Sequence, residues 1–415
     1  MAATVAGRPD FWQDGDCRQK RLCAVPQVDV TMWALHTGLL FIGTLLTALG
    51  YGATFLLTEH FRTLGGSEVS TGLTLAGAMV GTFLGVPLVG SFADRLGAAR
   101  MAALGALLLA LGYQCLASLA VVNGWTTLAG LLIGLGWGIF YLAAPLSLSV
   151  RVTDDNRAFW FARFGAFQMG GIGLSPIVAT ALIRELNFST AAALSTVAAC
   201  CLLASVLLFV FETMSRDAKT ASTTANRGWL RALPLVLATR ARYPILMVGL
   251  GASVFTGLMT FQTSLVRGTA LEASTYFAVY GITVVLARLT LASHMARVNA
   301  DRLAVMLLVL MCLGVLLANF MALGVAVQVG SAILLGLGYG LVYSVIQTQV
   351  INDAPLELRH AALTWFVMTY FVGIFGFPIV CGWLIVRMGT GWCLAVVLAI
   401  ALAELTLAVL RRRAH

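Results

Sequence analysis

The stretch GIGLSPIV at positions 171–178 returns, slightly altered, as GIFGFPIV at positions 373–380, which is 202 residues later. A single similarity of this kind between two apolar segments can arise by chance. Other pairs of similar segments with the same separation would indicate an internal repeat. The segment IGLGWGIFY (133–141) superimposes on LGLGYGLVY (335–343), with glycines and aromatic residues in register. More weakly, GSFADRLGAAR (90–100) superimposes on ASHMARVNADR (292–302). Three segments that share one offset predict a chain built from two related halves.

The composition is that of a membrane protein. Hydrophobic residues fill 60% of the 415 positions, charged residues only 10%, and the mean hydropathy is +0.93, whereas soluble domains carry about 25% charged residues. We predict an all-α polytopic protein with twelve transmembrane helices, because apolar runs of about 20 residues, long enough to cross a bilayer, recur along nearly the whole chain. Barrel strands are excluded because they have about 10 residues of alternating polarity.

The expected spans are 32–57, 69–91, 101–120, 125–150, 158–183, 190–211, 243–266, 275–293, 303–323, 325–350, 361–386 and 390–410. The ninth and tenth spans meet near Leu323 and Gly324 with no charge between them, so only the repeat divides them.

Basic residues predict the orientation of the spans, because Lys and Arg beside membrane helices favour the cytoplasmic side. With twelve spans and a cytoplasmic N-terminus, only Arg62, Arg184, Arg267 and Arg387 of the 26 basic residues fall on the outer side. A missed or additional span would exchange the sides of every later loop. We therefore expect an integral protein of the cytoplasmic (inner) membrane with both termini in the cytoplasm. This topology explains the net charge of +9, so no nucleic-acid partner is expected.

Six spans return the chain to the side on which it began, so a second copy has the same membrane orientation as the first. The halves are then parallel repeats around a shared midplane site. The predicted parts are a cytoplasmic N-terminal tail (1–31), an N-terminal six-helix bundle (32–212), a cytoplasmic linker (213–242), a C-terminal six-helix bundle (243–410) and a cytoplasmic C-terminal tail (411–415).

The segment GSFADRLGAAR is similar to a signature of the major facilitator superfamily of secondary transporters, which joins the second and third helices of that fold. Gly90, Asp94, Arg95 and Gly97 match it, and Arg100 is the nearby basic residue where the family usually has several. The resemblance covers about residues 30–410. Within the family, the chain resembles bacterial members that export drugs and metabolites.

The resemblance implies a conformational latch. Asp94 would place a negative charge at the N-terminal end of the helix expected to begin near Ala361, where the helix dipole attracts it. This contact would form in the outward-open state and break on switching. The latch residues are Gly90, Asp94, Arg95, Gly97 and Arg100.

The segment GAFQMGGIGLSPIVA (165–179) is similar to the glycine-rich antiporter signature of the same family, with Ser175 where a glycine is usual. Exporters carry this signature more often than importers, so the resemblance favours efflux. Its glycines permit close helix packing and its proline bends the span. The expected packing and hinge residues in the two halves are Gly171, Gly173, Pro176, Gly373 and Pro378.

Ionisable side chains inside a span cost about 2.5–3.5 kcal/mol each and need a reason to be there. Glu404 and His36 are the candidates for proton coupling, although Gly130 stands where proton-driven members often have arginine. Arg163 and Arg288 are candidates for binding an anionic substrate, or they anchor helix ends at lipid phosphates.

The resemblance also implies a central cavity formed mostly by the first, fourth, seventh and tenth spans. Residues four apart lie on one helix face, which pairs Trp137 with Tyr141 and Tyr339 with Tyr343. An aromatic chamber with a few hydrogen-bonding groups suits an amphipathic organic molecule. The expected cavity residues are Tyr51, Trp137, Tyr141, Phe255, Gln262, Tyr339, Tyr343 and Gln347.

The predicted function is secondary transport of a small amphipathic organic molecule by alternating access, with export preferred. Uptake of a small organic anion, or a membrane sensor that does not transport, are the alternatives. An enzyme is not expected, because no cluster of His, Asp, Glu or Cys marks a metal or nucleophile site. We expect no cofactor and no metal, and a monomer whose partners are the substrate, the lipid bilayer and, as a candidate, protons.

The eight cysteines show no disulfide pattern. Six lie in or near apolar spans, and Cys17 and Cys23 are expected in the reducing cytosol. We interpret all of them as packing residues or incidental thiols.

Overall fold

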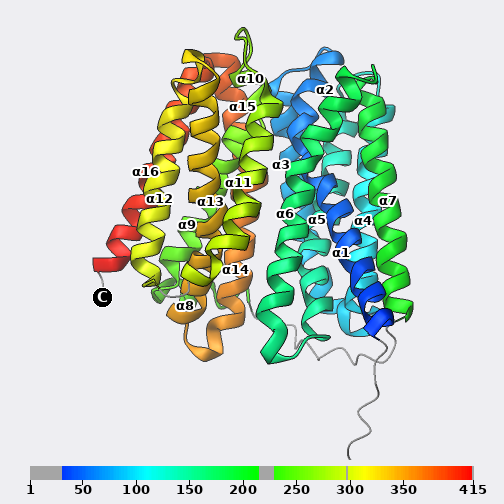
Figure 1. The fold of residues 1–415 in the computed structure, drawn as a ribbon, viewed down its shortest axis with the longest axis vertical. Helices are drawn as coiled ribbons and strands as arrows, with labels where there is room; N and C mark the ends of the chain where they lie inside the picture. The colour runs from blue at the N-terminus through cyan, green and yellow to red at the C-terminus, as the bar shows by residue number, and fades with distance from the viewer. Residues whose placement is uncertain (1–29, 215–228, 296–297, 414–415) are drawn as a thin grey trace, which may run out of the picture.

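The computed structural model describes residues 30–214, 229–295 and 298–413. Among these residues, twelve helices are long and apolar enough to cross a membrane. They form two bundles of six helices that stand side by side (Figure 1). The predicted fold class is therefore confirmed. We call the end at which α1 begins and α16 ends the terminal side, and the opposite end the distal side.

The helices follow one another in the order of the predicted spans. The first bundle contains α1 (Val30–Gly52), η2 (Ala53–Leu56), α2 (Leu57–Thr63), α3 (Glu68–Leu96), α4 (Ala98–Ser118), α5 (Gly124–Ser149), α6 (Asp154–Arg184) and α7 (Thr190–Met214). The second contains α9 (Arg242–Met259), α10 (Gln262–Leu265), α11 (Ala273–Met295), α12 (Ala300–Ala318), η3 (Met321–Leu323), α13 (Val325–Asp353), η4 (Leu356–Leu358), α14 (Arg359–Phe371), η5 (Val372–Gly376), α15 (Phe377–Met388) and α16 (Thr390–Arg413). The short α8 (Leu233–Ala238) precedes the second bundle.

The division between the ninth and tenth spans is confirmed. Helix α12 ends at Ala318 and α13 begins at Val325, after Gly324 with a φ of 138°. A left-handed backbone of this kind is accessible to glycine at no steric cost, so the chain reverses there without a charged loop. Of the expected tails and linker, residues 1–29, 215–228 and 414–415 lie outside the described residues.

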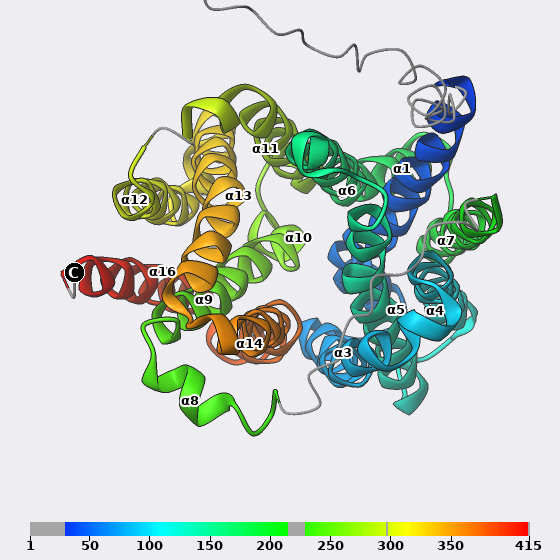
Figure 2. The same cartoon turned by 90° about the horizontal axis from the view of Figure 1, so that it is seen from below.

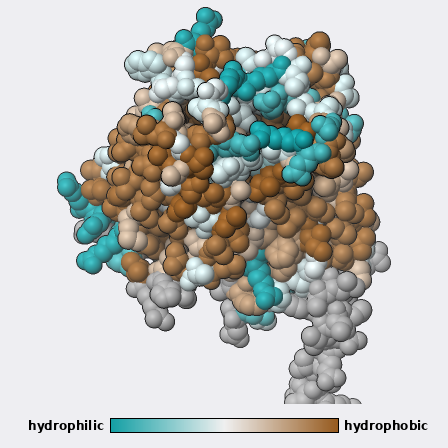
Figure 3. Space-filling view, turned by 45° about the horizontal axis from the view of Figure 1, so that its top comes forward, coloured by the Kyte–Doolittle hydropathy of each residue, from teal (hydrophilic) through white to brown (hydrophobic). Residues whose placement is uncertain are grey.

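Apolar side chains cover much of the face seen in Figure 3, and more polar side chains gather toward its upper end. Exposed apolar side chains of the molecule include Leu84, Leu202, Phe209 and Leu289. In lipid these side chains need no partner, and helices satisfy their own backbone hydrogen bonds. Exposure that would cause aggregation in a soluble protein is therefore what a membrane helix requires.

The sequence repeat is also a repeat of packing. In the first bundle, a Cβ at Gly136 would lie 2.8 Å from the backbone nitrogen of Leu109. In the second, a Cβ at Gly338 would lie 2.5 Å from the backbone nitrogen of Met311. Gly338 and Met311 lie 202 positions after Gly136 and Leu109, respectively. The aligned glycines therefore serve one purpose in both bundles, the close approach of two helices.

Three side chains contact their own repeat counterparts across the bundles. Hydrogen bonds join Thr58 to the Thr260 carbonyl at 3.3 Å, Arg62 to Ser264 at 2.7 Å, and the Tyr141 and Tyr343 hydroxyls at 2.5 Å, each across 202 residues. A residue can touch its own copy only close to the axis that relates the two copies. These contacts therefore mark the pseudo-twofold axis between the bundles.

The bundles meet through two symmetry-related helix pairs. Helix α6 packs on α11, and α3 packs on α15, the continuation of α14 (Figure 2). At the second pair, a Cβ at Gly72 would lie 2.6 Å from the Ile379 Cα, and one at Gly382 would lie 2.4 Å from the Glu68 carbonyl oxygen. Glycines thus let the distal parts of α3 and α15 come into direct backbone contact.

The two copies of the opening motif differ in local structure. GIGLSPIV runs as regular α-helix inside α6, with Pro176 in the helix interior, whereas the second copy overlaps the π-helix η5, which ends just before Pro378. Gly171 faces the Leu45 carbonyl oxygen of α1, and Gly373 faces the Gly249 carbonyl oxygen of α9. The hinge role of these residues stays a prediction, and η5 is a candidate position for it, since π-turns occur frequently at functional sites.

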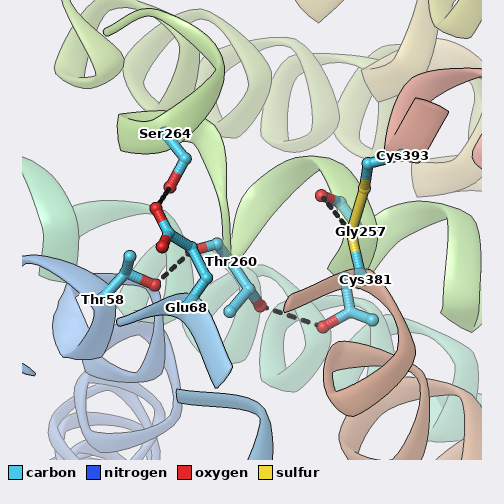
Figure 4. The surroundings of a disulfide bond; sticks show 8 residues. Thr58, Glu68, Gly257, Thr260, Ser264, Cys381 and Cys393 are labelled. Carbon is cyan, nitrogen blue, oxygen red and sulfur yellow. Dashed lines mark hydrogen bonds between the residues drawn. A yellow bond between two sulfur atoms is a disulfide. The ribbon is translucent and has the colours of Figure 1, made fainter. Parts of the chain in front are cut away.

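One expectation about cysteines is wrong. Cys381 of α15 and Cys393 of α16 form a disulfide with a Cα–Cα distance of 5.7 Å (Figure 4). Gly389, with a φ of 95°, reverses the chain between the two helices and brings both sulfur atoms to one depth. Sequence spacing alone does not reveal which faces of two adjacent helices meet. Cys17 and Cys23 lie outside the described residues.

Candidate functional site

A cavity lies between the two bundles, and all six expected aromatic residues line it. They come from α1, α5, α9 and α13, namely Tyr51, Trp137, Tyr141, Phe255, Tyr339 and Tyr343. They meet because the first and fourth helices of each bundle face the axis. The wall is completed by polar groups from other helices, of which Gln168, Tyr280, Arg288 and Tyr370 are the members.

Each bundle contributes a stacked pair of aromatic rings. Tyr51 stacks on Trp137 with ring centroids 4.7 Å apart and an interplanar angle of 19°. Phe255 stacks on Tyr339 with centroids 4.7 Å apart and an angle of 9°. Trp137 and Tyr339 are repeat counterparts, whereas Tyr51 and Phe255 are not, since the counterparts of these two are Ser253 and Ala53. Both bundles nevertheless present flat apolar ring faces.

Two hydrogen-bond donors in this wall are without a partner in the described part of the chain. The Tyr51 hydroxyl and the Trp137 indole nitrogen are buried and make no hydrogen bond with any described residue, and each side chain is 1% exposed. A buried polar group without a partner costs about 1–3 kcal/mol. Both side chains line the cavity, where a ligand with acceptor atoms would satisfy them.

Arg288 of α11 brings a positive charge to the cavity. Its Nε and Nη2 donate to the Gly340 carbonyl oxygen of α13 at 3.1 and 3.0 Å. Arg163, the other expected anion-binding residue, lies elsewhere: it is exposed on α6, and its guanidinium carbon lies 4.1 Å from the centroid of the Phe159 ring. The structure therefore does not bring the two arginines together.

The two expected glutamines also lie away from the cavity lining. Gln262 is fully buried in α10 near the distal side, with its amide nitrogen 3.7 Å from the Met321 sulfur atom. Gln347 is half-buried on α13. Helix α9 ends at Met259, before Gln262, so a face extrapolated through one continuous helix is wrong at that position.

Sequence reasoning missed the cavity side chains of α6, α11 and α14, which lie where the two bundles meet (the seam). Tyr370 of α14 stacks on Tyr141 with centroids 5.7 Å apart, and Gln168 and Tyr280 line the cavity from α6 and α11. The signal was present, because Tyr370 belongs to the aromatic segment WFVMTYF (365–371). Tyr370 lies on the eleventh span, outside the four spans expected to supply most of the wall.

The distal side of the cavity is closed by an ionic cluster centred on Glu68 of α3. The Glu68 carboxylate accepts from Arg62 at 2.6 Å, from Ser264 at 2.9 Å and from Arg267 at 3.1 Å. Figure 4 shows the carboxylate pointing at Ser264, across the seam. Glu68 is 6% exposed, whereas the side chains of Arg62 and Arg267 are 21% and 57% exposed, so the carboxylate is buried and its cationic partners reach the surface. A second pair, Arg184 with Glu272, joins the same side of the bundles.

The terminal side of the cavity is more open. Tyr141, Arg288 and Tyr343 are part-exposed and lie toward this side, while Tyr51, Trp137 and Phe255 are at most 4% exposed. The hydrogen bond between the Tyr141 and Tyr343 hydroxyls spans the axis here. The conformation is therefore closed on the distal side.

The expected latch residues occupy the turn between α3 and α4 on the terminal side. Gly97 has a φ of 91°, a value that requires glycine in a tight turn. Asp94 and Arg95 are exposed, and Arg100 is half-buried with its guanidinium carbon 5.9 Å from the Phe209 ring centroid. The role of Gly90, Asp94, Arg95, Gly97 and Arg100 as a latch stays a prediction.

Sequence reasoning missed the ion pair that backs this turn. Glu212 at the end of α7 packs against Gly97, where a Cβ would collide with its carboxylate. The same carboxylate accepts from Arg151, beyond the end of α5, at 2.9 Å. In the second bundle the corresponding ends carry the opposite arrangement, with Arg411 donating to Asp353 at 2.8 Å.

Glu404 is fully buried in α16, and neither carboxylate oxygen has a hydrogen-bond partner among the described residues. Both oxygens would lie 2.9 Å from a Cβ at Gly251 of α9. An unpaired buried charge is costly, so an acidic residue at this position is unusual. His36 lies in α1, and its side chain is outside the described residues.

Comparisons with known proteins agree with this architecture. The sequence matches the family model described as Major Facilitator Superfamily over residues 40–378. No curated protein gives a significant match.

Solved transporter structures share the fold. The nucleoside transporter NupG has 18% identity and a TM-score of 0.70, covering 91% of this chain and 98% of that one. The POT family transporter PepTSo has 12% identity and a TM-score of 0.70, covering 91% and 98%. A bacterial homologue of the iron transporter ferroportin, in an outward-facing state, has 15% identity and a TM-score of 0.65, covering 91% and 99%.

Proposed function

This chain belongs to the Major Facilitator Superfamily, and we propose that it exports a small amphipathic organic molecule by alternating access. The observation that carries the proposal is the aromatic cavity on the pseudo-twofold axis, with the bundles tied together on its distal side. Rocking of two bundles about such a site exposes it to each side of the membrane in turn.

We assign the terminal side to the cytoplasm of a cell with this protein in its inner membrane. The distribution of basic residues supports this orientation. The Cys381–Cys393 disulfide joins α15 and α16 near the distal side, and structural disulfides persist outside the reducing cytosol. The conformation described above is then closed to the outside, with the cavity facing the cytoplasm, as an exporter requires when it loads its substrate.

Two auxiliary roles complete the proposal. The turn with Asp94 acts as the latch that holds the outward-open state, as the signature implies. Glu404 is the candidate proton carrier, because it is the buried carboxyl group without a partner among the described residues. Export would then be coupled to proton entry through a group that charges only when the bundle around it opens to water.

Transport by the purified protein in proteoliposomes tests the function. Under an imposed pH gradient, we expect saturable flux of at least one compound from a library of lipophilic amines, sugars and organic acids. Trp137→Ala should reduce that flux at least tenfold, whereas Trp392→Ala should not, because Trp392 is 58% exposed at the molecular surface. Substrate-dependent proton movement should stop in Glu404→Gln.

Two results would contradict the proposal. Absence of flux for every compound, with ligand binding retained, would indicate a sensor. Flux only into the compartment that faces the terminal side would indicate uptake. Uptake of an organic anion is the second candidate function, because an arginine lines the cavity.

A further inference from the structure

The cavity has an unbalanced charge. Among its lining residues, all of which belong to the described part of the chain, Arg288 is the charged one, and the rest are aromatic, aliphatic, amide or glycine. The buried carboxyl group of Glu404 does not neutralise it, since that group packs behind α9 against Gly251 and is not part of the lining. The cavity therefore presents a positive charge in a wall of low polarity.

Arg288 is held in place, and within the described residues its hydrogen bonds use only part of its donors. Its Nε and Nη2 both donate to the Gly340 carbonyl oxygen, which fixes the plane of the guanidinium group. The remaining nitrogen, Nη1, lies 3.4 Å from the position that a Cβ on Gly165 of α6 would take. A guanidinium has five N–H donors, so this orientation leaves donors for an anion on the side away from Gly340.

This position is unlike that of an arginine that anchors a helix to lipid. Arg163 is of that second kind: it is exposed on α6 and covers the rings of Phe159 and Trp160 at 4.1 and 5.4 Å. Arg288 instead lies within the seam between the bundles, bonded to the neighbouring helix α13. Binding to a phospholipid headgroup therefore does not explain why a charge is placed there.

The other unsatisfied groups of the wall are also donors. The Trp137 indole N–H can only donate, and the Tyr51 hydroxyl can donate as well as accept, and neither has a partner among the described residues. Both belong to the stacked pair of the first bundle, opposite the Phe255 and Tyr339 pair of the second. Flat ring faces, together with hydrogen-bond donors that lack an acceptor among the described residues, favour a flat ligand rich in acceptor atoms.

Resting on the transport function above, we propose that the substrate is a flat aromatic monoanion. Its ring packs against the stacked pairs, and its carboxylate or equivalent acidic group accepts from Arg288. The ion pair forms away from bulk water, so it neutralises the charge of the cavity before the bundles move. Tyr51 and Trp137 supply the remaining donors to polar substituents on the ring.

Binding of three matched probes to the purified full-length chain in lipid nanodiscs tests the proposal. The probes are naphthoate, naphthamide and naphthylmethylamine, which share a ring system and differ in charge. Calorimetry should show naphthoate binding about 10- to 100-fold more tightly than naphthamide, the range expected for charge-assisted hydrogen bonds, and naphthylmethylamine binding most weakly. Arg288→Gln should reduce this preference to less than threefold while naphthamide binding is retained.

Two further variants separate charge recognition from a folding defect. Arg163→Gln, the matched control on the exposed face of α6, should keep the full preference for naphthoate. Arg288→Lys keeps the charge but loses the planar donor group, so it should retain a reduced preference. A preference that survives in Arg288→Gln, or tighter binding of the neutral or cationic probe to the unmodified protein, would overturn the proposal.

Flux of the same probes distinguishes this proposal from the transport function on which it rests. Binding of naphthoate that depends on Arg288, without flux of any probe, supports the anion site and contradicts the proposed function. Equal flux of naphthoate and naphthamide, unchanged in Arg288→Gln, overturns the anion site and leaves the proposed function standing.

Discussion

The two sides of the cavity differ in the contacts that join the bundles. On the distal side, a buried carboxylate, two arginines and a serine form an ionic cluster, and glycines bring α3 and α15 into backbone contact. On the terminal side, the Tyr141 and Tyr343 hydroxyls share a neutral hydrogen bond on the axis. Charge-assisted hydrogen bonds are worth about twice a neutral one. The comparison teaches why the distal side is the closed one, while the terminal side, joined by a single neutral bond on the axis, is the more open one.

The largest expected effect comes from Glu68→Gln. The change leaves Arg62 and Arg267 close together without the carboxylate that both contact. The Glu68 side chain is 8% exposed but that of Arg267 is 57% exposed, so the cost is below the value of about 3–5 kcal/mol typical of a fully buried pair. We expect the equilibrium to shift about tenfold toward a distally open state, which corresponds to about 1.4 kcal/mol. Spin labels at Leu186 and Leu323, both exposed on the distal side, should report longer distances.

Glu59→Gln is the matched control for this experiment. Glu59 also pairs with Arg62, at 3.4 Å, but its side chain is 47% exposed, and pairs of that kind contribute about 0–1 kcal/mol. The control should leave the distance distribution close to that of the unmodified protein. If Glu68→Gln also left it unchanged, the ionic cluster would not be what holds the distal side closed.

A smaller effect, in the opposite direction, is expected for Tyr141→Phe. Loss of one hydroxyl removes the hydrogen bond on the axis, worth about 1 kcal/mol, and should favour opening of the terminal side about fivefold. Labels at Phe159 and Leu356, exposed on that side, measure the change.

Tyr113→Phe removes a hydroxyl that bonds to the Gly50 carbonyl oxygen within the first bundle. It should lower thermal stability without moving the labels at Phe159 and Leu356. Equal movement in both tyrosine variants would show that the axial hydrogen bond has no special part in closure.

The smallest effect concerns the exposed pair Arg184–Glu272. The hydrogen bond from Arg184 lowers the pKa of the Glu272 carboxyl below its ordinary value of 4.5. Because the folded-state pKa is lowered, the contribution to distal closure is fully present above pH about 4.5 and is lost as the pH falls through the lowered value. We expect a change of less than twofold in the distal distances between pH 6 and pH 3.5, absent in Glu272→Gln. A larger change that persists in Glu272→Gln would assign it to another group.

Much of the cavity could be predicted because helical spacing and the repeat act together. Trp137 and Tyr141 are four residues apart and so share a face, and their copies Tyr339 and Tyr343 share the matching face. The prediction failed where a helix stopped: Gln262 follows the break after Met259 and no longer lies on the face of Phe255. Periodicity describes one uninterrupted helix and carries no information about where tertiary contacts interrupt it.

The repeat also does not predict where the two halves differ in chemistry. Close to the same place in each bundle, a glycine of the first helix faces Cys201 in the first bundle, at Gly50, and Glu404 in the second, at Gly251. Cys201 is an ordinary buried side chain, while Glu404 is an acid without a partner among the described residues. Sequence comparison of the halves aligns these helices but does not show that both side chains point inward.

By itself, the sequence determined the number of spans, the two parallel halves, the close-packing glycines and the aromatic character of the site. These follow from hydrophobic length, from self-similarity at one offset and from helical period, which are local properties of the chain. Tertiary structure alone decided which side is closed, that Arg288 and not Arg163 reaches the cavity, and that Cys381 meets Cys393. Those outcomes depend on the rotation and relative depth of neighbouring helices, which packing between helices sets and no single helix contains.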